Sequence, residues 1–116
     1  MQQPIPTPLP TLGQYLFDSL KAEGISEAFG VPGDYNFSLL DTLEQYDGIR
    51  FINGRNELGA GYASDGYGRL RGLSALITTF GVGEMSACNA IAGANSENVP
   101  LITYRRGSQV NGSAGA

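Results

Sequence analysis

The sequence predicts an α/β fold, a doubly wound parallel sheet flanked by helices. Short apolar runs that are typical of buried strands alternate along the chain with longer segments of helical periodicity. Turns that contain glycine or proline separate these segments. Alternating strands and helices favour βαβ units, which place parallel strands between two layers of helices. In such a sheet, ligands bind beyond the carboxyl ends of the strands.

The composition excludes several classes of function. The chain has 116 residues, which fits one domain, and a net charge of −4 without a basic patch, so nucleic acid is not an expected partner. It has no histidine and one cysteine, Cys88, which excludes the usual zinc site and the Ser-His-Asp and Cys-His nucleophiles. No apolar run reaches the roughly 18 residues of a membrane helix. A lone cysteine suits a reducing compartment, so we expect a cytoplasmic protein without a membrane partner.

We expect three parts along the chain. Residues 1–10 contain four prolines and are expected to form an extended, Pro-rich arm. Residues 11–104 form the folded domain. Residues 105–116 contain three glycines and one branched aliphatic residue, so a flexible tail is expected there.

The first half of the domain is expected to hold two helices and two strands. Thr11 can cap a first helix, and Gly24 ends this helix. The capping box is expected to be incomplete because Gln14 stands at N3, although Gln14 can still reach back. A short strand at 27–29, a helix at 35–46 and a strand at 50–52 follow. The apolar residues that set the helical period are Leu12, Tyr15, Leu16, Phe17 and Leu20, and then Leu39, Leu40 and Leu43.

The second half begins with a helix at 56–70 of poor intrinsic propensity. Four glycines lie inside it, each costing about 0.5–1 kcal/mol relative to alanine; they are Gly59, Gly61, Gly66 and Gly68. Either a neighbouring backbone packs closely against them, or this helix is marginal. The run 74–80 is the clearest strand, and its apolar character suits burial on both faces.

A helix at 84–95 and a strand at 100–104 complete the predicted elements. The apolar side of this helix is predicted to consist of Met85, Cys88, Ile91 and Ala92, with Cys88 as a small core residue.

Glu57 is the first candidate for chemistry. It follows the second strand and the turn Asn53-Gly54, and it falls in the first turn of the next helix, at the mouth of the sheet. We expect the fold to hold this carboxyl group in an apolar place. The alternative from spacing alone is an acid that complements the helix dipole, worth about 0.3–1 kcal/mol.

Further candidates lie in the loops after the first and third strands. By spacing alone, Asp34 is an N-cap for the helix at 35–46 and Pro32-Gly33 is an ordinary turn. Thr79, taken alone, is a strand-end residue whose hydroxyl satisfies backbone.

The segment at 81–86 has the strand-to-helix context of a dinucleotide fingerprint. However, Ser86 replaces its third glycine, and Glu84 would repel phosphate at the helix N-terminus. Nicotinamide binding is therefore not expected.

Five segments carry a family resemblance: GQYLF at 13–17, FGVPGDYN at 29–36, NEL at 56–58, ASDGY at 63–67 and TTFGVGE at 78–84. Together they resemble the N-terminal, pyrimidine-binding domain of thiamine diphosphate-dependent 2-oxo acid decarboxylases, fungal-type pyruvate decarboxylases in particular. The resemblance covers about residues 11–102. Indolepyruvate and branched-chain 2-oxo acid decarboxylases are similar here, so the resemblance specifies the family better than the substrate.

The resemblance implies a role for each candidate. Glu57 matches a buried glutamic acid that hydrogen-bonds N1′ of the cofactor's aminopyrimidine, a role that requires a carboxyl pKa raised by burial. Asp34 matches an acidic residue used for proton transfer beside the reacting carbon. The implied catalytic residues are therefore Glu57 and Asp34, and the implied cofactor-binding residues are Glu57, Pro32, Gly33, Thr79 and Val82.

The implied reaction converts a 2-oxo acid such as pyruvate into an aldehyde and carbon dioxide, with thiamine diphosphate supplying the carbanion chemistry. The family continues after the fourth strand into a pair of histidines, and a separate domain binds the diphosphate through magnesium. This chain has no histidine. We therefore expect an incomplete sheet, no magnesium site in this chain, and a truncated pyrimidine-side fragment that is inactive alone.

Partners follow from the same resemblance. We expect self-association or pairing with a diphosphate-binding domain. The alternatives are a non-catalytic interaction domain that pairs with a full-length homologue, and a non-functional remnant.

Overall fold

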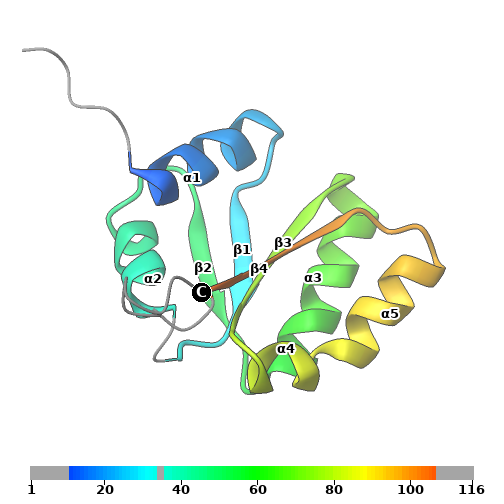
Figure 1. Cartoon of the computed structure of the whole chain (residues 1–116). Coiled ribbons are helices and arrows are strands. Elements are labelled where there is room, and N and C mark those ends of the chain that lie inside the picture. The colour runs from blue at the N-terminus through cyan, green and yellow to red at the C-terminus, as the bar shows by residue number, and fades with distance from the viewer. Residues whose placement is uncertain (1–10, 34–35, 107–116) are drawn as a thin grey trace, which may run out of the picture.

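The computed structural model describes residues 11–33 and 36–106 (Figure 1). The predicted arm at 1–10, the tail at 107–116 and the candidate Asp34 lie outside the described residues.

A four-stranded, all-parallel sheet forms the centre of the molecule. Its strands are β1 (Glu27–Gly30), β2 (Arg50–Asn53), β3 (Ser74–Thr79) and β4 (Leu101–Arg106), in the spatial order β2-β1-β3-β4. The helices α1 (Leu12–Ala22) and α2 (Phe37–Glu44) lie on one side of the sheet. The helices α3 (Glu57–Arg71), α4 (Val82–Ser86) and α5 (Cys88–Ser96) lie on the other (Figure 1). The predicted doubly wound α/β fold is confirmed.

Each face of the sheet has its own apolar core, because successive strand residues point to opposite faces. In β3, Ile77 packs in the core beneath α1 and α2 with Phe17 and Leu43. The preceding residue, Leu76, packs in the core beneath α3 with Phe29. Leu76 and Ile77 are 0% and 1% exposed, so the prediction of a strand covered on both faces is confirmed.

The capping box at the start of α1, which was expected to be incomplete, is complete. The Thr11 hydroxyl accepts a hydrogen bond from the backbone N–H of Gln14 at 3.2 Å. The Gln14 side chain accepts one from the backbone N–H of Thr11 at 3.0 Å. These two bonds satisfy N–H groups that a helix start otherwise leaves without partners.

The glycines of α3 are explained by close packing at two positions. A Cβ atom built on Gly61 would lie 2.7 Å from the Cβ of Ala90 in α5, and one built on Gly68 would lie 3.0 Å from the Ser74 hydroxyl. A Cβ on Gly66 would meet nothing within 4 Å. The helix therefore uses Gly61 and Gly68 to approach its neighbours, while Gly66 has no such packing role.

The helix predicted at 84–95 is two helices, α4 and α5, and only part of its predicted apolar side is buried: Ile91 packs against the core, whereas Ala92 is exposed. Met85 is 75% exposed and Cys88 is also exposed, whereas Ala87, Ala90 and Ala94 are buried. Close contact between α5 and Gly61 leaves room only for small side chains on the buried side of α5. Cys88 therefore faces outward from α5, and Met85, in the separate helix α4, is exposed as well.

Strand β4 runs two residues past its predicted end. Arg105 and Arg106 pair with Thr78 and Thr79 of β3, so these two residues belong to the sheet and not to a tail. The backbone of β3 offers the hydrogen-bonding groups that extend the strand. Within the described ranges, no helix is long and apolar enough to cross a membrane.

Candidate functional site

The candidate site lies along the carboxyl ends of the four parallel strands. From β1 the chain moves to β2 on one side, and it then crosses through α3 to β3 on the other side of β1 (Figure 1). This reversal makes the ends of β1 and β3 a topological switch point, where open α/β sheets bind ligands. The loops after both strands contain residues that the sequence singled out.

The two strands approach closely at the switch point. A Cβ built on Gly30 would lie 2.0 Å from the carbonyl oxygen of Ile77, so only glycine fits at the end of β1. A Cβ built on Gly33 would lie 2.7 Å from the Cβ of Thr79, and one on Gly83 would lie 2.9 Å from its Cγ2. Thr79 therefore fills the space between the β1 loop and α4. The structure brings the predicted residues Gly33 and Thr79 into contact.

Asn36 holds the β1 loop, and the sequence analysis gave it no role. Its side chain is fully buried; the Oδ1 accepts a hydrogen bond from the Gly33 N–H at 2.7 Å, and the Nδ2 donates one to the Val31 carbonyl at 3.2 Å. Asn36 is also the residue before α2, which begins at Phe37 and not at Tyr35. The interpretation of Asp34 as the N-cap is therefore wrong. An asparagine three residues after a Pro-Gly turn is the signal that could have found this residue.

Glu57 occupies the predicted position in the first turn of α3. Asn56 caps the helix, since its side chain accepts a hydrogen bond from the Gly59 N–H at 2.7 Å. The end of β2 is tied to β1, because the Gly54 N–H donates to the Gly30 carbonyl at 2.8 Å. Glu57 is half-buried, which is less burial than the sequence analysis expected.

The Glu57 carboxylate has no hydrogen bond or ion pair with any residue that the structure describes. Glu57 follows β2, which lies two strands from β3 and Thr79. Strands are spaced by about 4.8 Å, so roughly 10 Å of sheet edge separates the two strand ends. The half-buried Glu57 carboxyl group therefore has no partner among the described residues. It lies at the same edge of the sheet as the contact between Gly33 and Thr79.

Val82 opens α4 with its side chain 76% exposed. It follows Gly81, whose backbone has φ +76° and ψ −93°, in a region that favours glycine. Phe80 and Met85 are 38% and 75% exposed, and we call these two residues and Val82 the α4 patch. The loop after β3 thus presents apolar side chains to the surroundings.

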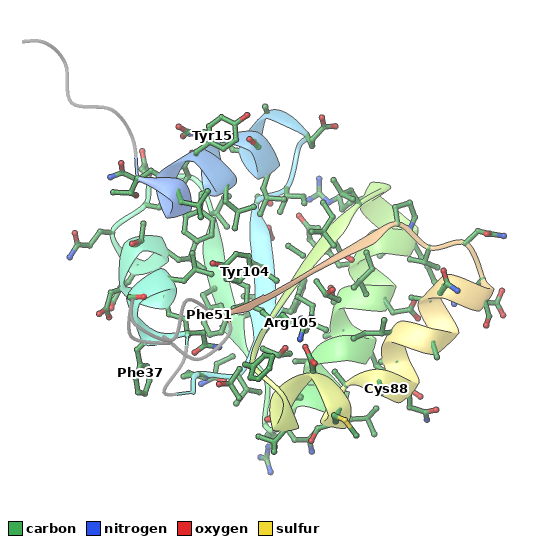
Figure 2. The ribbon with its side chains drawn as sticks, viewed as in Figure 1. Tyr15, Phe37, Phe51, Cys88, Tyr104 and Arg105 are labelled. Atoms are coloured by element: carbon green, nitrogen blue, oxygen red, sulfur yellow. The ribbon has the colours of Figure 1, made fainter. Side chains whose placement is uncertain are left out.

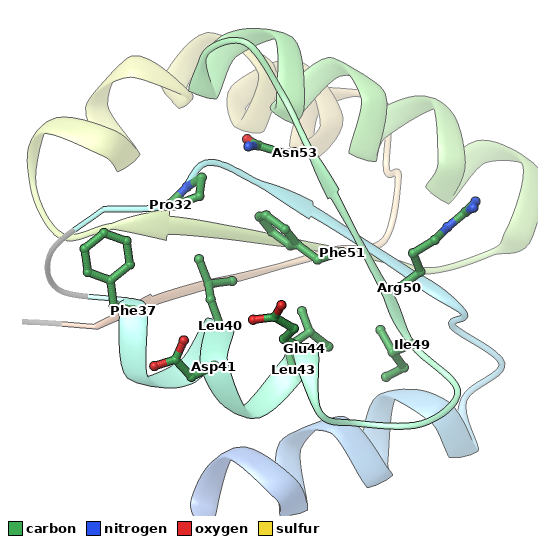
Figure 3. A pocket seen from close by; sticks show the side chains of 10 residues that line it. All are labelled: Pro32, Phe37, Leu40, Asp41, Leu43, Glu44, Ile49, Arg50, Phe51 and Asn53. Carbon is green, nitrogen blue, oxygen red and sulfur yellow. The ribbon is translucent and has the colours of Figure 1, made fainter.

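An open hollow of about 580 Å³ lies beside this edge, between α2 and the outer strand β2 (Figure 3). Phe37 and Leu40 from α2 face Phe51 from β2 across it. Pro32 is the one predicted site residue that lines this hollow, and Glu57 and Thr79 do not. This hollow is therefore beside the switch point and not at it.

Within residues 11–33 and 36–106, no three His, Cys, Asp or Glu side chains gather into a group that could hold a metal ion.

The comparison with protein families gives one match. Residues 10–106 match the family described as "Thiamine pyrophosphate enzyme, N-terminal TPP binding domain". These residues include the whole sheet and every candidate site residue.

The comparison with individual proteins finds alpha-keto-acid decarboxylases. The chain is 58% identical over 95 residues to the alpha-keto-acid decarboxylases of Mycobacterium avium (strain 104) and Mycobacterium tuberculosis (strain ATCC 25618 / H37Rv). It is 59% identical over 95 residues to that of Mycobacterium ulcerans (strain Agy99). Each match covers 82% of this chain and 17% of the relative. The chain thus corresponds to about one sixth of the length of these curated relatives.

Proposed function

Since the chain belongs to the thiamine pyrophosphate enzyme family through its N-terminal TPP-binding domain, we propose that it forms the pyrimidine-binding side of a 2-oxo acid decarboxylase active site. The relatives named above are alpha-keto-acid decarboxylases. The observation that carries the proposal is Glu57, a half-buried carboxyl group without a protein partner among the described residues, at the edge where this fold binds ligands.

The residues at this edge fit an aminopyrimidine ring. Glu57 offers a carboxyl group that can share a proton with the ring nitrogen N1′. Gly33 and Thr79 are in close contact, and Gly33 has no side chain, so a flat ring can lie near the backbone there. Val82 supplies an exposed apolar side chain beside it, and Pro32 lies exposed on the β1 loop.

In this proposal, thiamine diphosphate supplies the carbanion chemistry that cleaves the bond to the carboxylate of the substrate. Glu57 holds the proton at N1′ and orients the ring. Asp34, from the β1 loop, moves a proton beside the reacting carbon. The protein's contribution is thus orientation and proton placement.

We further propose pyruvate as the 2-oxo acid, an aldehyde and carbon dioxide as products, and magnesium as the ion that binds the diphosphate outside this chain. A cytoplasmic location is proposed with them, supported by the single cysteine.

The test is isothermal titration of the purified chain with thiamine diphosphate and magnesium, comparing the wild type with Glu57→Gln. A hydrogen bond to a charged group contributes about 1.5–3 kcal/mol, so we expect the dissociation constant to rise about tenfold or more. Glu44→Gln is the matched control, because Glu44 lines the hollow beside α2 and not the switch point.

Two outcomes would contradict the proposal. Equal affinity of the wild type and Glu57→Gln for thiamine diphosphate would show that Glu57 does not bind the cofactor. A loss of affinity in Glu44→Gln alone would place the ligand in the hollow.

The α4 patch favours a second candidate function, an interaction domain that pairs with a homologous, full-length enzyme or with itself. Exposed apolar side chains that lie together often mark an interface. We expect Val82→Ser combined with Met85→Ser to reduce the mass measured by light scattering toward that of a monomer. Leu70→Ser is the control, since Leu70 is 88% exposed on α3 and outside the patch. A monomeric wild type that also fails to bind a full-length homologue would reject this function.

A further inference from the structure

Arg105 lies where the end of β4 meets the loop after β3. In the sheet register, Arg105 of β4, which Figure 2 labels, is opposite Thr78, the residue that precedes Thr79. The loop continues through Phe80 and Gly81 into α4, and it carries two proposed cofactor-binding residues, Thr79 and Val82. Arg105 is therefore next to the site in space, although 23 residues separate it from Val82 in the sequence.

One guanidinium contacts both ends of this loop. The Arg105 Nη1 donates a hydrogen bond to Glu84 Oε1 at 3.1 Å, in the first turn of α4. The Arg105 Cζ lies 5.3 Å from the centre of the Phe80 ring. Gly81, Val82 and Gly83 lie between the two contacted residues. Fixing Phe80 on one side and Glu84 on the other therefore restricts the turn between them.

The loop needs such support because of its own composition. Glycine has more backbone freedom than any other residue, so Gly81 does not by itself define the turn. Val82 is exposed and offers little packing. A planar guanidinium can bond a carboxylate and stack on an aromatic ring from one side-chain conformation, which lysine cannot do.

We propose that Arg105 is a positioning residue that holds the β3–α4 loop in the conformation that binds the cofactor. The proposal rests on the proposed function for its link to the cofactor. The restraint on the loop conformation rests only on the contacts of Arg105 with Phe80 and Glu84. Arg105 acts through Phe80 and Glu84 and is not assigned a contact with the cofactor.

The first measurement is amide hydrogen exchange of residues 80–84 in the cofactor-free chain. We expect these amides to exchange about fivefold faster in Arg105→Gln, because local opening becomes easier. Arg105→Lys keeps the positive charge but loses the planar guanidinium group that lies over the Phe80 ring. It should therefore restore part of the protection from hydrogen exchange. Arg69→Gln is the matched control, since it breaks an ion pair with Asp65 on α3 at 3.3 Å, away from the loop.

The second measurement is the thiamine diphosphate affinity of the same variants by titration with magnesium. We expect Arg105→Gln to weaken binding several-fold at an unchanged melting temperature, and Arg105→Lys to recover part of it. Exchange rates unaffected by Arg105→Gln would overturn the proposal, and so would faster exchange with unchanged affinity. If the wild type binds no thiamine diphosphate, the proposed function fails, while the exchange rates still decide whether Arg105 holds the loop.

Discussion

At the residue scale, polar side chains near the site are defined by their bonding partners. Asn36 is buried with both ends of its amide bonded to the β1 loop, whereas Glu57 is half-buried and has no partner among the described residues. A buried amide that keeps its hydrogen bonds stabilises one loop conformation. A free carboxyl group at the sheet edge keeps its bonding capacity for a ligand. Asn36 thus supports the loop, whereas Glu57 is the residue proposed to bind the ligand.

Tyr46 shows how such a contact changes titration. Its hydroxyl donates a hydrogen bond to Asp18 and, with burial and the charge of Asp18, this raises the pKa of Tyr46 from 10.0 to about 12. Because the folded state favours the protonated phenol, this contribution to stability is fully present below pH 10 and is lost as pH rises toward 12.

We expect Asp18→Asn to lower the pKa of Tyr46, as measured by the difference in phenolate absorbance between each protein and its Tyr46→Phe version. The stability of the wild type should fall over the same pH range more than that of Asp18→Asn. An unchanged Tyr46 titration in Asp18→Asn would show that the hydrogen bond does not control this pKa.

At the element scale, α3 carries the site residue Glu57 at its first position and depends on neighbours for its stability. Its glycines weaken it as an isolated helix. Gly61 and Gly68 allow it to lie close to α5 and to the start of β3. The packing of α3, and not its propensity, therefore holds Glu57 at the sheet edge.

Two alanine substitutions in α3 separate these effects. Gly66→Ala should raise the free energy of unfolding by about 0.5–1 kcal/mol, because its Cβ meets nothing within 4 Å. Gly61→Ala should lower it by about 1–3 kcal/mol, because its Cβ would lie 2.7 Å from that of Ala90. Chemical denaturation measures both. Equal effects of the two substitutions would contradict the packing account.

At the scale of the whole molecule, the proposed function makes the described sheet one side of a site. Within residues 11–33 and 36–106, β2 and β4 each have a neighbouring strand on one side only. The chain has no histidine, and it matches 17% of the length of its relatives. Glu57, Gly33 and Thr79 lie along one open edge, with the α4 patch exposed nearby. This arrangement is compatible with the proposed pyrimidine-binding side of an active site.

We expect the purified chain to produce no acetaldehyde from pyruvate in the presence of thiamine diphosphate and magnesium. The reason is that, in the proposed function, the diphosphate and its magnesium ion are bound outside this chain. Coupled reduction of acetaldehyde by NADH measures this, with a full-length decarboxylase as the positive control. Turnover that Glu57→Gln abolishes would refute the expectation of an inactive half-site.

The sequence by itself determined the features that depend on neighbouring residues. The Thr11–Gln14 capping box, the order of strands and helices, and the place of Glu57 at the start of α3 all follow from local bonding and periodicity. The five segments that resemble the family were also visible in the sequence, and the family match confirms that resemblance.

Only the tertiary structure decided the features that depend on residues far apart in the chain. These are the strand order β2-β1-β3-β4 and the contact of Gly33 with Thr79. They also include the burial of the alanines of α5 and the contacts of Arg105 with Phe80 and Glu84. Periodicity marks which residues of a helix share a side, but the partner that packs against the helix decides which side is buried. For α5 that partner is Gly61, 29 residues before Ala90, and a close approach between such distant residues leaves no local trace in the sequence.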